Sequence, residues 1–300
     1  MKIVLATAIG AVITMMIMFN SVLAVKTGQV FANIVIHLVG LAAASLLIPV
    51  LEKKHINEKP PLYLYVGGVC GFFIVVSNNV CFAVLGASLT LSLGIMGQCL
   101  GSVIADSMGF LGMTRHPFHH RRLVGFGIIL MGILFMIEQW RVNAFYIAIA
   151  VLTGMLVVVT MVVNAQLALR IGVFRGTRIN YITGLGTVAL FALAGGVDVT
   201  GSFTLLASLH PLYIFGGGIC GVTAVVGINY ILPRIPVIYG TLLFFLGQVV
   251  AGLVIDYLFY RTLSPRRLLG AVIVLSGLAM NMLADRAATP KRKRCSPGSS

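Results

Sequence analysis

Two glutamines lie in the middle of long apolar stretches, and each is followed by an aspartate at the same spacing. The pairs are Gln98 with Asp106 and Gln248 with Asp256. An uncharged amide inside a membrane needs hydrogen-bond partners because lipid offers none. A neighbouring helix or a bound solute can supply them. A carboxylate inside the membrane is a candidate for binding and releasing a proton.

The position of the two aspartates leaves two interpretations open. Eight residues at 1.5 Å rise place each acid about 12 Å from its glutamine, near the edge of a core of roughly 30 Å. One interpretation is a surface acid that pairs with the arginines that follow it. The other makes Asp106 and Asp256 proton-coupling carboxylates.

Asparagines accompany the glutamines in corresponding places of the two halves. They could line the same cavity, or they could cap helix ends. The candidate substrate-cavity residues are Gln98, Gln248, Asn79, Asn229, Asn20 and Asn164. His37, alone inside an apolar stretch, is expected to pack rather than to relay protons. We expect no catalytic residue, no cofactor and no metal.

The chain is one unit written twice. The glutamines are 150 residues apart, and the same offset matches further residues before them: Asn79 with Asn229, Gly71 with Gly221, Cys70 with Cys220, Gly68 with Gly218, Gly67 with Gly217, Tyr63 with Tyr213 and Pro61 with Pro211. Internal repeats in membrane proteins are typical of transporters, whose substrate site lies where the repeats meet.

The composition indicates an integral membrane protein. The chain is 59% hydrophobic and 9% charged, whereas a soluble domain has about 25% charged residues. The net charge of +14 does not indicate nucleic-acid binding, because the Lys and Arg residues lie between apolar runs. We expect an all-α membrane fold with ten transmembrane helices, at residues 3–25, 30–51, 62–84, 85–109, 123–137, 144–169, 179–196, 212–232, 237–260 and 268–284.

Charge placement predicts the orientation of the spans. If the N-terminus is inside, most of the 21 Lys and Arg residues fall on the inside, as the positive-inside rule requires. Both termini are then cytoplasmic. Five helices per repeat is an odd number, so the two repeats must be inverted in the membrane. The expected organisation is a first repeat at residues 1–143, a second at 144–284 and a basic disordered tail at 285–300.

Three stretches carry a resemblance to a known family. They are Tyr65-Val-Gly-Gly-Val-Cys-Gly-Phe-Phe, Gly94-Ile-Met-Gly-Gln-Cys-Leu-Gly-Ser-Val-Ile-Ala-Asp and Arg121-Arg-Leu-Val-Gly-Phe-Gly. They resemble the YdcZ-like family of bacterial inner-membrane proteins, in the drug/metabolite transporter superfamily. The resemblance implies a fused pair of five-helix units around a central cavity, an inner-membrane location, and export as the direction of transport. It implies no established substrate.

The expected function is a secondary transporter that moves a small organic metabolite or drug by alternating access. The mostly neutral candidates favour a neutral, zwitterionic or cationic solute over a multiply charged anion. The expected partners are a small-molecule solute and membrane lipid, with no nucleic acid, and a homodimer is left open. The alternatives are a non-transporting membrane scaffold or subunit, and a lipid-headgroup flippase.

Overall fold

The computed structural model describes most of the chain. The described residues are 2–52, 59–85, 87–113, 115, 122–135, 144–195, 200–255, 257, 265–266, 268–270, 272–274, 276–277 and 280. The glutamine-aspartate motif of the first half lies within these residues. In the second half Asp256 lies outside them, as do the tail at 285–300 and the side chain of Asn79.

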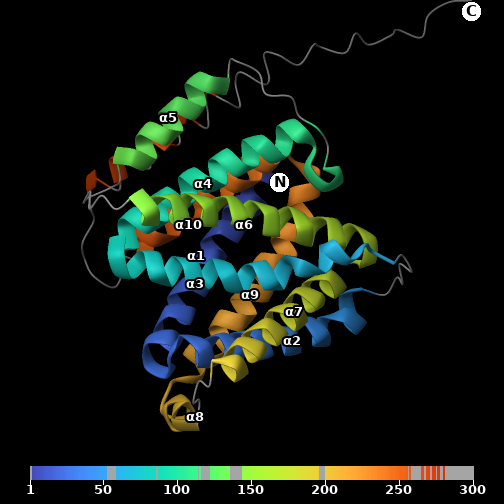
Figure 1. Ribbon diagram of the computed structural model, residues 1–300. Helices are drawn as coiled ribbons and strands as arrows, with labels where there is room; N and C mark the ends of the chain where they lie inside the picture. The colour runs from blue at the N-terminus through green and yellow to red at the C-terminus, as the bar shows by residue number, and fades with distance from the viewer. Residues whose placement is uncertain are drawn as a thin grey trace, which may run out of the picture.

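The described residues form helices and no strand (Figure 1). The first half contains α1 (Lys2–Thr27), α2 (Gln29–Leu51), a 3₁₀ turn at Leu62–Val66, α3 (Gly67–Leu85), α4 (Ala87–Met108), a 3₁₀ turn at Phe110–Gly112 and α5 (Arg122–Phe135). The second half contains α6 (Ala144–Ile171), α7 (Val173–Ala194), α8 (Thr200–Ala207), α9 (Pro211–Ile231), a 3₁₀ turn at Leu232–Arg234 and α10 (Val237–Ile255).

Several of these helices match the dimensions of a membrane. Within the described residues, four are long and apolar enough to cross one, at Lys2–Thr27, Gln29–Leu51, Ala144–Ile171 and Pro211–Arg234. Shorter apolar stretches lie at Leu62–Asn78 and Val237–Gly252. Most of the surface of these long apolar helices is left exposed by the rest of the described chain, which is typical of an all-α membrane protein.

Single glycines separate the first two helices of each half. Gly28 lies between α1 and α2 with φ 86°, and Gly172 lies between α6 and α7 with φ 101°. Residues with a side chain rarely adopt such positive φ values, so glycine is suited to both turns. The tight turn corrects one expectation. α7 begins at Val173 rather than at residue 179, so Arg175 and Arg178 are helical and do not lie in a loop.

One helix was not expected from the sequence. α8 follows α7 and covers the junction of α1 and α2. The Ser202 hydroxyl donates to the Thr27 carbonyl at 2.9 Å, and the Phe203 ring meets Phe31 edge-on with centroids 4.9 Å apart. Eight residues are too few for a membrane span, and too few for the periodicity of the sequence to reveal a helix.

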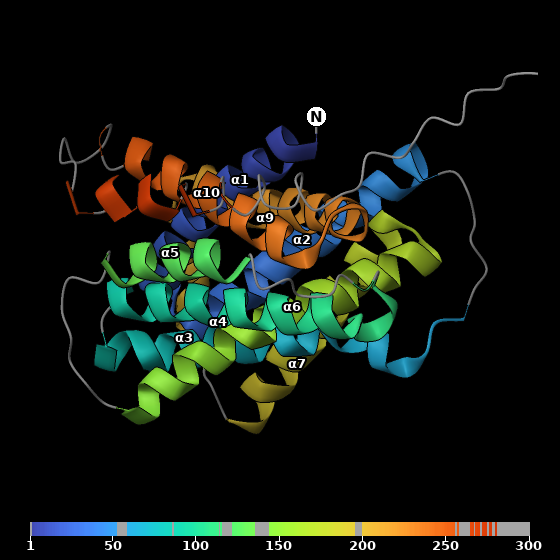
Figure 2. The same cartoon turned by 90° about the horizontal axis from the view of Figure 1, so that it is seen from above.

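The two halves exchange packing partners. α1 packs against α9 and α10 of the second half, and α6 packs against α3 and α4 of the first half. α2 and α7 lie against each other. Figure 2 shows α6 beside α4 and α3 in the lower part of the view. Each half therefore contributes its first helix to the other half.

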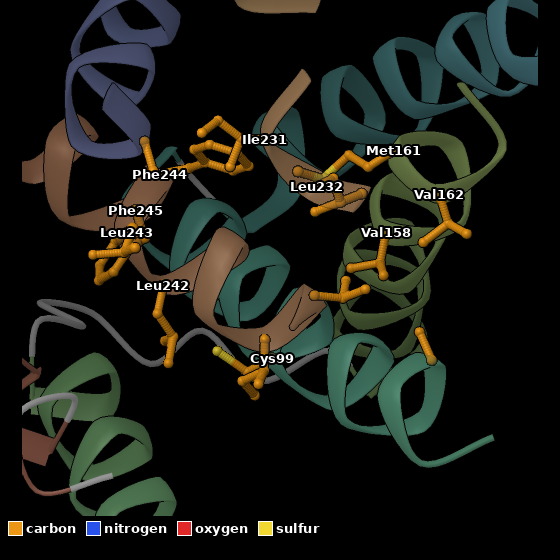
Figure 3. Close-up of a cluster of buried hydrophobic side chains, with 14 of the residues drawn as sticks. Cys99, Val158, Met161, Val162, Ile231, Leu232, Leu242, Leu243, Phe244 and Phe245 are labelled. Carbon is orange, nitrogen blue, oxygen red and sulfur yellow. The ribbon is translucent and has the colours of Figure 1, made fainter. Parts of the chain in front are cut away.

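The largest buried cluster lies where the halves meet. It joins side chains of α4, α6, α9 and α10, among them Cys99, Val158, Ile231 and Phe244 (Figure 3).

Gly132 of α5 is close enough to Val274 that an added Cβ would lie 2.8 Å from the valine side chain. The segment predicted as the tenth span therefore contacts α5.

Candidate functional site

Each glutamine directly follows a glycine at which two helices cross. A methyl group on Gly97 of α4 would lie 3.1 Å from the Cα of Gly154 in α6. A methyl group on Gly247 of α10 would lie 2.9 Å from the Cα of Gly10 in α1. Small residues allow such close backbone approach between membrane helices. Equivalent helix crossings therefore hold Gln98 and Gln248 at equivalent positions in the two halves.

The glutamine side chains are half-buried at these crossings. Neighbouring hydroxyl groups donate to their backbone carbonyls: Ser102 donates to that of Gln98 at 2.6 Å, and Thr14 donates to that of Gln248 at 3.1 Å. No hydrogen bond joins either side-chain amide to a residue that the structure describes. Within the described part of the chain, these amides therefore do not link helices by hydrogen bonds.

Polar contacts define an antiparallel register between α4 and α10. The hydroxyls of Ser102 and Thr241 are 2.8 Å apart and buried. One turn further along α4, Asp106 contacts the first residues of α10. Continued along both helices, this register places Gln98 level with Phe245, about one turn from Gln248.

Asp106 caps the N-terminus of α10. Its carboxylate accepts hydrogen bonds from the backbone N–H groups of Val237 at 2.7 Å and Ile238 at 2.9 Å. The side chain is 3% exposed. These N–H groups have no partner within their own helix, and a negative charge there is stabilised by the helix dipole. Asp106 is thus a buried interhelical cap, not the exposed surface acid that one interpretation of the sequence expected.

Glu52 forms a second cap that sequence reasoning missed. It follows α2, and its Oε2 accepts from the N–H groups of Phe174 at 2.8 Å and Arg175 at 3.0 Å, at the start of α7. In both caps, an acid at the end of a first-half helix holds the N-terminus of the equivalent second-half helix. The signal in the sequence was an acidic residue at the end of an apolar span. The helix N-terminus that this residue caps is distant in the sequence, so the cap could not be recognised.

Asn164 and Asn20 occupy matching places in the two halves. The Oδ1 of Asn164 lies against Gly67 of α3, and the Oδ1 of Asn20 lies against Gly217 of α9. Neither oxygen has a hydrogen-bond partner, and both are buried. Asn164 differs from Asn20 because its Nδ2 donates to the Oδ1 of Asn180 in α7 at 3.1 Å.

Asn229 belongs to the same polar region around α7. Its Nδ2 donates to the hydroxyl of Thr177 at 3.2 Å, its side chain is 2% exposed, and its Oδ1 has no partner. Thr177 and Asn180 are three residues apart and share one face of α7. The structure therefore brings Asn164 and Asn229 to one face of α7.

His37 and Tyr181 also occupy matching positions. They are 144 residues apart, the offset that relates Asn20 to Asn164, and their rings meet edge-on with centroids 5.8 Å apart. The Nδ1 of His37 lies 2.8 Å from the Asn33 carbonyl. His37 thus packs between helices. A comparison at the offset of 144 would have found this pair.

The comparisons with known proteins agree with this architecture. The chain is an all-α membrane protein built of two similar halves. A family model described as "Putative inner membrane exporter, YdcZ" matches residues 1–135 and 145–280. The chain therefore belongs to the YdcZ family, in a two-repeat form. This membership makes it an inner-membrane transporter of an exporter family and points to a non-enzymatic role.

A solved structure shares the fold. A crystal structure described only as that of a protein has a TM-score of 0.67 and 16% sequence identity; the match covers 94% of this chain and 98% of the other. At this identity the likeness shows the fold alone. No curated protein matches the sequence.

Proposed function

We propose that the chain is a secondary transporter that exports a small organic solute by alternating access. The observation that carries this proposal is the pair of Gly-Gln crossings. Each places a half-buried amide without a side-chain hydrogen bond to any described residue near the middle of an apolar helix. An unsatisfied amide in lipid is costly. A solute or water that binds between the helices removes that cost.

The contacts between equivalent helices support inverted repeats. Asp106 and Ser102 at the end of α4 meet the start of α10. In α2 and α7, Gly184 approaches His37 while Gly40 approaches Tyr181. Equivalent helices thus run antiparallel in both pairs, as a two-fold axis in the membrane plane requires. We assign the repeats to residues 1–143 and 144–284, with ten spans and both termini cytoplasmic.

The proposed solute is neutral, zwitterionic or cationic. The candidate residues Gln98, Gln248, Asn20, Asn164 and Asn229 are all amides, and three of them hold buried acceptor oxygens without partners. Free acceptor oxygens attract donor groups and disfavour multiply charged anions. Export as the direction rests on family membership, and the proton or membrane-potential gradient is the proposed energy source.

A ligand-induced stability screen tests the glutamines as a binding site. Purified protein is scanned by thermal unfolding against amino acids, polyamines and quaternary ammonium dyes. A compound at about 100 times its dissociation constant should stabilise the protein by roughly 2.7 kcal/mol. We expect this shift to disappear in the Gln98→Ala/Gln248→Ala variant and to persist in Gln29→Ala, which changes an exposed glutamine. An equal shift in the double variant contradicts the assignment.

Thiol labelling tests whether water reaches the same turn. Gln98→Cys is introduced while Cys99, which is 0% exposed, is kept as the buried neighbour, and the other cysteines are replaced by alanine. We expect a water-soluble maleimide to modify the introduced cysteine but not Cys99. Protection of both thiols in folded protein favours the alternative of a non-transporting scaffold or subunit. A flippase predicts stabilisation by lipid headgroups instead of by soluble compounds.

A further inference from the structure

The two ends of the helix bundle are packed differently. At one end, which we call the capped end, α2 and α4 finish, α7 and α10 begin, and Glu52 and Asp106 cap the two starting helices. Towards this end, residues 161–168 of α6 and residues 240–245 of α10 are all buried. A helix turns once in 3.6 residues, so both runs are covered on every side. Protein therefore encloses α6 and α10 at the capped end.

The equivalent residues at the opposite end are packed less closely. The positions 144 residues before 161–168 are 17–24 of α1, where only two residues are buried. Gly94 and Ile95 of α4 are half-buried, although their equivalents 150 residues later lie within the buried run 240–245. The repeat alone would give both ends the same packing. The two halves therefore have different arrangements.

One pair of helices shows this difference most clearly. Within the second half, α6 packs against α9 and against the 3₁₀ turn at Leu232–Arg234 that follows it. Figure 3 shows Leu232 beside Met161 in their shared buried cluster. Within the first half, the equivalent helices α1 and α3 do not pack against each other along their described residues. The second half is thus closed at the capped end, while the first half is not closed at the opposite end.

A buried hydrogen bond at the capped end has no counterpart in the other half. The hydroxyls of Ser102 and Thr241 join α4 to α10 at 2.8 Å. The residues 150 positions away are Gly252 and Leu91. Neither has a side-chain donor or acceptor. This contact between α4 and α10 can therefore form only at the capped end.

The two caps also differ between the halves. Glu52 binds the start of α7, whereas the residue 144 positions after it is Gly196, which has no acceptor side chain. Asp106 does have an equivalent acid, Asp256, which lies outside the described residues. Of the three polar contacts at the capped end, only one can be repeated at the opposite end by an equivalent residue. The side chains therefore favour the arrangement in which the capped end is closed.

We propose that Asp106, Glu52 and the Ser102–Thr241 hydrogen bond form a latch that keeps the capped end closed. In the second arrangement of the bundle, α6 and α9 separate while α1 and α3 close on each other. Exchanging the conformations of two inverted repeats produces this arrangement, and movement of one repeat against the other is how such proteins alternate access. The proposal rests on the proposed transport function and deepens it. With both termini cytoplasmic, the capped end is the cytoplasmic end.

Distances between spin labels test the latch without any solute. One cysteine pair, Leu169→Cys with Tyr230→Cys, lies near the ends of α6 and α9 at the capped end. The equivalent pair, Val25→Cys with Val80→Cys, lies near the ends of α1 and α3 at the opposite end. All four side chains are exposed, and the native cysteines are replaced by alanine. With the latch intact, we expect a shorter distance for the first pair than for the second.

Removing the latch should change both distances in opposite directions. In Asp106→Ala, we expect a longer distance to appear in the α6–α9 pair and a shorter one in the α1–α3 pair. The population of this second arrangement should rise about tenfold or more, the worth of one charged hydrogen bond. Adding Glu52→Gln should raise it further. Unfolding lengthens both distances, so the reciprocal change distinguishes opening of the latch from loss of structure.

Two variants serve as controls. Leu23→Ala removes a side chain that is 1% exposed at the opposite end, so it should destabilise the protein about as much as Asp106→Ala without opening the capped end. Asp256→Ala removes the equivalent acid and should not raise the second arrangement. Opening of the capped end by either control, or unchanged distances in Asp106→Ala/Glu52→Gln, overturns the latch. The ligand screen on the glutamines does not depend on these distances, so failure of the latch and failure of the transport proposal are distinguishable.

Discussion

Replacing Asp106 by alanine is expected to lower the free energy of unfolding by about 3 kcal/mol, because it removes two charge-assisted hydrogen bonds and leaves buried N–H groups without a partner. The carboxylate lies 2.7 Å and 2.9 Å from the N–H groups of Val237 and Ile238. Loss of this cap weakens the contact between α4 and α10. Unfolding of the detergent-solubilised protein by a graded denaturing detergent measures the effect.

Neighbouring variants separate the cap from a general effect of mutation. Ser107→Ala removes a hydroxyl that bonds only within its own helix, to the Ile104 carbonyl, and should change stability by less than about 0.5 kcal/mol. A cost for Asp106→Ala no larger than that for Ser107→Ala would refute the capping role.

The variant Asp106→Asn tests whether the same residue couples proton movement to transport. It keeps an acceptor oxygen but loses the charge, so we expect it to destabilise by about 1 kcal/mol. If Asp106 couples protons, the folded variant also loses uptake driven by a pH gradient into inverted vesicles. Undiminished pH-driven uptake by Asp106→Asn assigns Asp106 to capping alone.

Replacing Gly247 by alanine is expected to cost several kcal/mol, roughly 3 or more, as overpacking against a backbone does. The added methyl group would overlap the Thr7 carbonyl and lie 2.9 Å from the Cα of Gly10. A backbone carbonyl cannot rotate away as a side chain can, so α1 and α10 must separate. Unfolding in denaturing detergent and the yield of monodisperse protein measure the loss.

A second glycine of the same helix supplies the matched control for Gly247. A Cβ on Gly252 would meet nothing within 4 Å, so Gly252→Ala should be neutral or slightly stabilising, because alanine is the better helix former. Gly154→Ala, at the equivalent crossing of α6 with α4, should be as costly as Gly247→Ala. Similar stability of Gly247→Ala and Gly252→Ala would show that the crossing tolerates wider spacing.

The amino-acid sequence predicted the membrane class, the repeat and the ends of most helices. These properties are local or depend on identity between segments. A long apolar run can form only a helix in lipid, and the shared Gly-Gln pair shows the duplication without any knowledge of packing. The same pattern located Gln98 and Gln248, which the structure places at equivalent crossings.

The tertiary structure alone decided which helices meet. Lipid is as apolar as the helices, so hydrophobicity does not say which face turns inward. The exchange of α1 and α6 between the halves could not be predicted for this reason. The capping partner of Asp106 is 131 residues away, and a helix N-terminus accepts any acid that reaches it.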